Sequence, residues 1–361
     1  AALKSYADPR FHCYFISNVD GSEIQDVLKK IDPEKTLFII SSKSFTTLET
    51  LSNANAVRQW LQEKLGQKDI SSHFIAVTAA REKAIQWGIP DAQIFSIWDF
   101  VGGRYSVWSA IGLPVALMIG MNHFYEFLDG AHAMDHHFSQ TEFSKNLPVL
   151  LGLLGIWYIN FFGCQQQAII PYAHELRYFR NVIQQADMES NGKSVTRANQ
   201  PVDYTTGPVI LGQQGGDSQH SFFQHLHQAP HFTPVDFILI AKGTHFKALQ
   251  PLLIASALSQ AEALMKGRAE KNHQSIPGNR PSTVLFLEKI TPHALGSLMA
   301  LYEHKIFVQS VIWDINPFDQ FGVELGKQLL PGILNDLKQS HKTHEQDAST
   351  TGLIQYYRSI V

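Results

Sequence analysis

Residues 36–65, TLFIISSKSFTTLETLSNANAVRQWLQEKL, contain the pattern that determines the fold. This stretch begins with a short apolar run, continues through a loop rich in hydroxyl groups, and then places Leu51, Val57 and Leu61 along one stripe of a helix. An apolar run without alternation is typical of a strand that is buried on both faces of a parallel sheet. The stretch therefore predicts one strand–loop–helix unit of an α/β protein.

The same succession of strand and helix continues along most of the chain. Apolar runs that indicate strands lie at 11–17, 36–41, 73–78, 94–98, 168–172, 208–212, 236–241 and 282–288. Stretches that indicate helices lie at 23–30, 47–65, 80–87, 174–188, 244–266, 292–311 and 318–330, and a helical block occupies 107–163. Repeated units with right-handed crossovers build parallel sheets between layers of helices. We therefore expect an α/β fold with two three-layer α/β/α domains.

The length of the chain agrees with this division. At roughly 150 residues per domain, 361 residues correspond to about two domains. We place the first domain at 1–117 and the second, with most of the helical block as an insertion, at 118–330. Residues 331–361 are expected to form a helical carboxyl-terminal tail, in which the polar stretch 338–351 is solvated. The polar segment 267–281 is expected to be a surface loop.

Charge and composition exclude several classes of protein. Lys and Arg (29) nearly balance Asp and Glu (32), so the chain has no broad basic field for nucleic acid or an anionic membrane surface. The two cysteines, Cys13 and Cys164, are far apart in the sequence, which excludes a disulfide framework and favours a reducing, cytoplasmic location. Uncharged runs at 105–122 and 147–167 are marginal for a membrane span of about 20 apolar residues, and we expect buried helices there.

The loop after the strand at 36–41 is the first candidate site. Five of the seven residues 41–47 (SSKSFTT) carry a hydroxyl, and a helix follows directly. Ligands of open α/β sheets gather at the carboxyl ends of strands, and the free N–H groups and dipole of a helix N-terminus favour an anion. The loop therefore indicates a phosphate site. The alternative is an ordinary helix cap.

Two glycines and an arginine follow another expected strand. Gly102 and Gly103 allow a ligand to approach the backbone closely, and Arg104 supplies a permanent charge with planar donors. A tight turn with a surface arginine would have the same sequence.

The stretch 184–193 (QQADMESNGK) places a carboxylate near the end of an expected helix. Gln185 and Glu189 are four residues apart and share a helix face. Asn191-Gly192 is expected to end the helix in a left-handed turn, which leaves Glu189 at the lip of a site as a candidate general base. An exposed glutamate on a turn is the alternative.

A cluster of histidines is a possible metal site. Residues 215–231 contain His220, His225, His227 and His231, but no carboxylate completes a familiar metal site, so caps and solvated histidines are favoured over metal ligands.

In the segment 318–327 (FDQFGVELGK), Gln320 and Lys327 are seven residues apart. A continuous helix would place them on one face, because seven residues span two turns. A lysine over a cleft could bind an anion or assist proton transfer, whereas a solvated lysine on an exposed helix is the alternative.

Taken together, these segments strongly resemble the phosphoglucose isomerase family. DFVGGRYSVWSAIGLP at 99–114 is similar to one family signature, and ALYEHKIFVQSVIWDINPFDQFGVELGK at 300–327 is similar to the other. SSKSFTTLET, QQADMESNGK and GGDSQHSFFQHLHQ match further blocks in the same order. The resemblance covers essentially the whole chain and implies a pair of sugar-isomerase (SIS) domains.

The resemblance implies that the substrate is glucose 6-phosphate or fructose 6-phosphate. It assigns the substrate phosphate to Ser42, Lys43, Ser44 and Thr47; Ser44 stands where many members have threonine. It assigns other substrate contacts to Gly103, Gln185 and Gln320.

The resemblance also implies the catalytic groups. Glu189 corresponds to the base, Arg104 to the arginine beside the reacting carbons, His220 to the ring-opening histidine and Lys327 to its assistant. The implied reaction is aldose–ketose isomerisation in glycolysis and gluconeogenesis, by ring opening and an enediolate, with no metal or redox cofactor.

Finally, the resemblance implies a homodimer in which His220 is contributed across the interface and the tail reaches over the partner. Family members carry an earlier segment with a Gly-Gly-Ser loop, and residues 3–6 look like the remnant of the helix that follows it. Two other classes stay open on the residues alone: a non-catalytic SIS module that binds a sugar phosphate, and, more remotely, a metal-dependent hydrolase built on the histidines.

Overall fold

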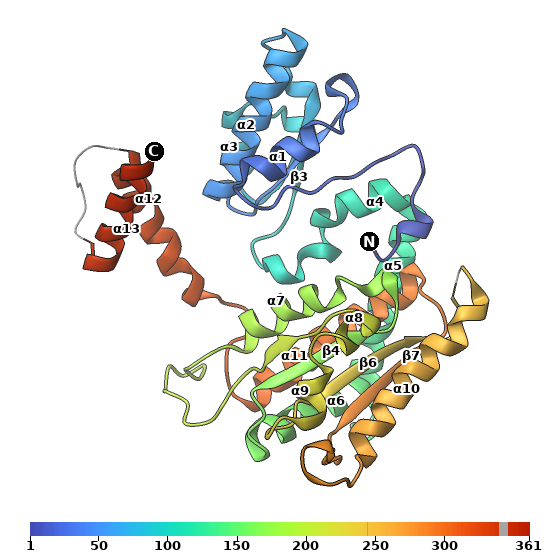
Figure 1. Cartoon of the computed structure of the whole chain (residues 1–361). Helices are drawn as coiled ribbons and strands as arrows, with labels where there is room; N and C mark the ends of the chain where they lie inside the picture. The colour runs from blue at the N-terminus through green and yellow to red at the C-terminus, as the bar shows by residue number, and fades with distance from the viewer. Residues whose placement is uncertain (244, 339–345) are drawn as a thin grey trace.

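The described residues form two separate parallel sheets. The computed structural model describes residues 1–243, 245–338 and 346–361. The first sheet has the order β1-β2-β3 and the second the order β5-β4-β6-β7. The strands are β1 (Phe38–Ser41), β2 (Phe74–Thr78), β3 (Ile94–Ser96), β4 (Gln166–Pro171), β5 (Val209–Leu211), β6 (Val235–Ile240) and β7 (Ser282–Leu287). The predicted α/β fold class is confirmed, and Figure 1 shows one sheet unit above the other.

The helices of the first unit lie on one face of its sheet. They are α1 (Gly21–Leu28), α2 (Leu48–Leu65) and α3 (Arg81–Trp87). Ile40 of β1 is buried in one cluster with Leu61 of α2 and Ala84 of α3. Right-handed crossovers between strands in the order β1-β2-β3 bring both connecting helices to the same face. These helices therefore form one layer on the first sheet, and the predicted second helical layer is not formed by them.

The predicted strand at 11–17 is wrong. This segment is irregular, and the side chains of Phe11 and Phe15 are 52% and 70% exposed. The edge strands β1 and β3 pair only with β2, so the segment has no strand neighbour. An aromatic run can resemble a strand in sequence, but without a pairing partner it does not form one.

The second sheet is covered on both faces. Its helices are α7 (Phe179–Asn191), α8 (Gly215–Gln219), α9 (Phe223–Gln228), α10 (Gln250–Lys266) and α11 (Pro292–Ile312). Ile169 of β4 packs in one cluster with residues of α7 and α11. The next residue, Ile170, packs in another with residues of α9 and α10. Because successive strand residues point to opposite faces, these clusters form the two sides of a three-layer unit.

The helical block joins the two units and packs against α11. It contains α4 (Leu113–Ile119), α5 (Met121–Gln140) and α6 (Leu147–Ile156). Helices α5 and α11 approach each other through glycines: a Cβ at Gly130 would lie 1.9 Å from the His293 carbonyl oxygen, and one at Gly296 2.0 Å from that of Phe127. Among the described residues, no helix has both the length and the apolar character needed to span a membrane.

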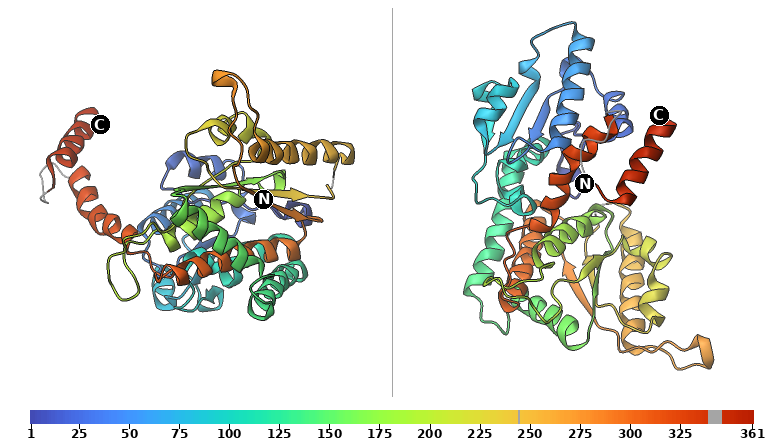
Figure 2. Two further views of the ribbon diagram at one scale, coloured as in Figure 1. Left: turned by 90° about the horizontal axis from the view of Figure 1, so that it is seen from below. Right: turned by 90° about the vertical axis from the view of Figure 1, so that its left-hand side faces the viewer.

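The carboxyl-terminal helices project from the rest of the molecule, as Figure 1 and the left view of Figure 2 show. They are α12 (Glu324–Lys338) and α13 (Ala348–Ile360). Apolar side chains of this pair remain uncovered: Leu325 is 61% and Leu353 67% exposed. The predicted solvated stretch 338–351 is described only in part, because 339–345 lie outside the described residues. The rest of it includes the first turn of α13.

Candidate functional site

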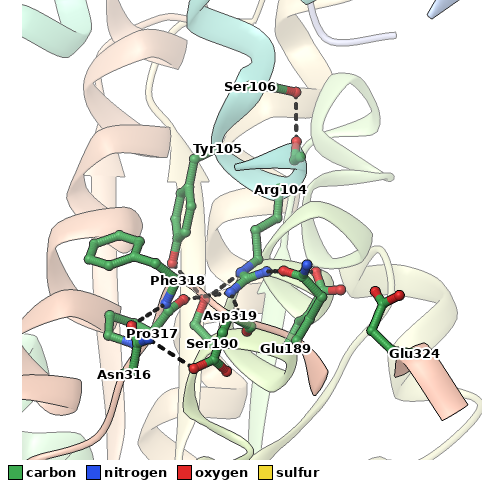
Figure 3. A network of polar contacts seen from close by, with 12 residues as sticks. Arg104, Tyr105, Ser106, Glu189, Ser190, Asn316, Pro317, Phe318, Asp319 and Glu324 are labelled. Atoms are coloured by element: carbon green, nitrogen blue, oxygen red, sulfur yellow. Dashed lines mark hydrogen bonds and ion pairs between the residues drawn. The ribbon is translucent and has the colours of Figure 1, made fainter. Parts of the chain in front are cut away.

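Arg104 lies at the centre of a polar network that joins three parts of the chain. It is the second residue of the 3-10 helix η5 (Gly103–Trp108), and its side chain is only 3% exposed. Its Nη1 lies 3.2 Å from Glu189 Oε2 and donates to Gln320 Oε1 at 3.1 Å. Its Nη2 donates to the Asp319 carbonyl at 3.0 Å. Figure 3 shows that the guanidinium faces Glu189. The structure thus brings together three predicted site residues from distant segments.

Open space lies beside the backbone next to this arginine. A Cβ at Gly103 would have no heavy atom within 4 Å. No neighbouring protein group would therefore clash with a side chain at position 103. This agrees with the predicted approach of a ligand to the backbone at this point.

Glu189 lies in the last turn of α7, with 23% of its side chain exposed. Gln185, one turn earlier, is exposed. The predicted left-handed end of the helix is wrong, because Gly192 has φ −73°. Glycine is needed there for another reason: a Cβ would lie 2.5 Å from the Met188 carbonyl oxygen. The end of the helix is close-packed, and this fixes where Glu189 projects.

A buried ion pair anchors the same helix to the core. Lys305 Nζ of α11 lies 2.9 Å from Asp187 Oδ2, and both side chains are at most 1% exposed. Asn191 donates to the other oxygen of Asp187 at 3.0 Å. Removing one partner of such a pair is strongly destabilising, because it leaves an uncompensated buried charge. The pair therefore fixes the position of α7 along its axis, two residues from Glu189.

Two residues in this network were not predicted from the sequence. Ser190 Oγ lies 2.7 Å from Arg104 Nε and 2.7 Å from the Tyr105 hydroxyl. Lys193 Nζ donates to the Glu189 carbonyl at 2.8 Å. Both residues lie within the block QQADMESNGK, so their adjacency to Glu189 was the only signal that could have identified them.

The turn before α12 places Gln320 and separates it from Lys327. Asn316 Nδ2 donates to Asp319 Oδ2 at 2.8 Å and closes the turn. Gln320 has φ −152° and precedes the helix, which begins at Glu324. The predicted common helical face of Gln320 and Lys327 is therefore wrong. Lys327 is 58% exposed and pairs with Glu324 at 3.0 Å, whereas Gln320 contacts Arg104.

The hydroxyl loop closes over the start of α2. Ser42 is buried, and its Oγ lies 3.1 Å from Thr47 Oγ1. Thr47 is the first residue before α2 but its side chain does not cap the helix. The N–H groups at this helix end are thus left without a side-chain acceptor from that position, as an anion site requires. Ser44 is exposed, and its Oγ accepts from the Thr46 hydroxyl at 2.8 Å.

Lys43 connects this loop to the segment that leads to Arg104. Its Nζ donates to the Asp99 carbonyl at 2.5 Å. The loop and the arginine therefore lie at the same end of the first sheet, as parallel strands place their carboxyl ends together.

His220 is the exposed residue that directly follows α8. Among the described residues, the side chains and carbonyls that contact Arg104 do not include His220. The described residues contain no group of three or more His, Cys, Asp or Glu side chains that could hold a metal ion.

Comparison with known proteins gives consistent matches. The family model for phosphoglucose isomerase matches residues 1–354. Glucose-6-phosphate isomerase of Methylococcus capsulatus is 48% identical, over 99% of this chain and 70% of its own length. That of Pseudomonas fluorescens (strain Pf0-1) is 50% identical, over 99% of this chain and 68% of its own length. The crystal structure of glucose-6-phosphate isomerase from Chlamydia trachomatis superimposes with a TM-score of 0.88 at 35% identity, over 100% of this chain and 69% of that one.

Proposed function

The chain belongs to the phosphoglucose isomerase family, and we propose that Arg104 and Glu189 carry out its chemistry. The activity is the aldose–ketose isomerisation of glucose 6-phosphate and fructose 6-phosphate, a step of glycolysis. The non-catalytic sugar-phosphate-binding alternative is not favoured, because the matched relatives are named as isomerases over nearly the whole chain.

The ion pair between Arg104 and Glu189 is the observation that supports these roles. Isomerisation moves a proton from C2 of the sugar to C1 through an enediolate. Glu189 accepts the C2 proton and returns it to C1, and a positioned base of this kind contributes about 10²–10⁴-fold. Arg104 stabilises the negative oxygen that develops, which a preorganised charge in a shielded site does best. The 3.2 Å separation of their side chains supports the proposal that both groups act on one substrate.

The hydroxyl loop is proposed to hold the phosphate. Ser42, Lys43, Ser44 and Thr47 would bind it at the amino end of α2, and Gly103, Gln185 and Gln320 would contact the sugar. Binding energy from the phosphate, which does not react, orients C1 and C2 beside Glu189. The uncapped start of α2 and the contact from Lys43 to Asp99 support this assignment.

Ring opening is assigned to His220 with Lys327. Neither residue contacts the Arg104–Glu189 pair within one chain, and we propose that His220 serves the site of the partner in a homodimer. The exposed apolar residues of α12 and α13 support such a partner, because large uncovered apolar surfaces mark interaction sites.

We also propose a cytoplasmic location and retain the domain boundaries 1–117, 118–330 and 331–361.

A coupled assay tests the proposed function. Formation of glucose 6-phosphate from fructose 6-phosphate is followed with an NADP-linked dehydrogenase, after the isomerase has been treated with EDTA and dialysed. We expect the same rate with and without the EDTA treatment, and a much lower rate of fructose 6-phosphate formation from mannose 6-phosphate. Loss of activity that returns only with a divalent metal would contradict the proposed metal-free chemistry of Arg104 and Glu189.

Subunit mixing tests the placement of His220. Homodimers of His220→Ala and of Glu189→Gln should each be nearly inactive. In a heterodimer, one site receives both native residues, so random exchange should restore roughly one quarter of wild-type activity. A mixture of Glu189→Gln with Glu189→Ala is the control and should stay inactive. Absence of recovery, with subunit exchange verified by mass, would place His220 in the site of its own chain.

A further inference from the structure

A second carboxylate lies within reach of the central arginine. The Asp319 carbonyl oxygen accepts a hydrogen bond from Arg104 Nη2 at 3.0 Å. The side chain of Asp319 leaves the Cα atom that is bonded to this carbonyl group, so it starts close to the guanidinium. Figure 3 shows Asp319 beside Arg104. A carboxylate on this side of Arg104 would neutralise the charge that the reaction needs.

Two donors hold that carboxylate in another direction. Lys193 Nζ lies 3.2 Å from Asp319 Oδ1, and Asn316 Nδ2 donates to Oδ2 at 2.8 Å. Both carboxylate oxygens therefore have a partner other than Arg104. Among the ion pairs formed by the described residues, Arg104 pairs with Glu189 alone, and Asp319 pairs with Lys193.

The lysine is itself fixed from three sides. Its side chain is 13% exposed, and its Nζ also donates to the carbonyls of Glu189 and Asp319 at 2.8 and 2.7 Å. Burial lowers the pKa of Lys193, and the hydrogen bond and charge of Asp319 oppose that change. Lys193 thus spans from the end of α7, which carries Glu189, to the turn that carries Gln320.

We propose that Lys193 is a positioning residue, which holds the Asp319 carboxylate away from Arg104 and so reserves the arginine charge for Glu189 and the sugar oxygens. This inference rests on the proposed roles of Arg104 and Glu189. It assigns to Lys193 no contact with the substrate. Its effect should therefore appear in kcat, while the phosphate loop maintains KM.

A double-mutant cycle tests the proposal. Lys193→Met should lower kcat by about 30–100-fold, less than the loss of a whole oxyanion donor, with KM changed by less than about threefold. Asp319→Asn keeps the shape of the side chain and its contact with Asn316, and should cost less than about fivefold. The double variant should recover to within about fivefold of Asp319→Asn, because the freed carboxylate that blocks Arg104 is gone. Lys193→Gln provides the same comparison if Lys193→Met does not fold.

A matched control separates this effect from general loss of a cation. Arg197 forms an exposed pair with Asp314 at 2.7 Å near the same turn, so Arg197→Met should leave kcat unchanged. A merely structural role for Lys193 predicts a double variant no faster than Lys193→Met, and that result would overturn the proposal. A wild-type chain without isomerase activity would instead count against the proposed function, so the two failures are distinguishable.

Discussion

Glu189→Gln is expected to lower kcat for isomerisation by about 10³–10⁴-fold in both directions, near the upper range for a general base. The amide has the shape of the carboxylate and can still accept from Arg104, which lies 3.2 Å from Oε2 in the native chain. Substrate binding should therefore survive, with KM changed by less than about fivefold. Initial rates measured with each sugar phosphate, combined with thermal unfolding, would separate lost chemistry from lost structure.

The control for this variant is Glu82→Gln, on the exposed surface of α3. It makes the same chemical change far from the network in the sequence and should leave kcat unaltered. A Glu189→Gln enzyme with more than about one tenth of native kcat would exclude Glu189 as the base, because no base would then have been removed.

Arg104→Met is expected to have the second-largest effect, with kcat lower by about 10²–10³-fold, as for loss of one preorganised oxyanion donor. The loss should exceed that of Arg104→Lys, since a lysine keeps the charge but cannot match the planar set of donors. In the native chain these donors reach Ser190, Asp319 and Gln320 simultaneously. Comparison of kcat for the three proteins would show how much of the effect comes from charge and how much from geometry.

Arg104→Met also removes the side-chain donor to the carbonyl of the buried residue Pro317, so some loss of stability is expected, on the order of 1–3 kcal/mol. Urea unfolding measures it independently of activity. If Arg104→Lys and Arg104→Met retained native kcat, the developing oxygen charge would have to be stabilised by other groups, and the assigned role of Arg104 would be wrong.

The central strands of the second sheet were predictable because their apolar runs are continuous and their burial is nearly complete. Residues 168–172 and 236–241 were predicted as strands, and β4 and β6 lie within one or two residues of those bounds. The segment 11–17 is also largely apolar but has no pairing partner, and pairing is a property of the tertiary structure. Helix 318–330 was predicted to begin too early, because the turn at Asn316–Gln320 is held by Arg104, more than two hundred residues away.

The site was predictable where local sequence carries its own signal. Arg104 after two glycines and Glu189 near a helix end were both identified, and the structure brings them into contact. Ser190 and Lys193 were missed because their importance depends on partners from other segments. The position of Lys327 could not be predicted from the sequence. Lys327 lies on the projecting helix α12, and no local sequence pattern indicates the direction in which this helix runs.

Hydrogen exchange at the substrate tests the central claim most directly. Glucose 6-phosphate incubated with enzyme in D₂O is followed by proton NMR at C2, which reports removal of that proton whether or not fructose 6-phosphate is formed. We predict that the wild-type chain replaces the C2 proton with deuterium and that Glu189→Gln does not, although it still binds the sugar phosphate. Exchange at the native rate in Glu189→Gln would mean that another group removes the proton, and the account given for this site would be contradicted.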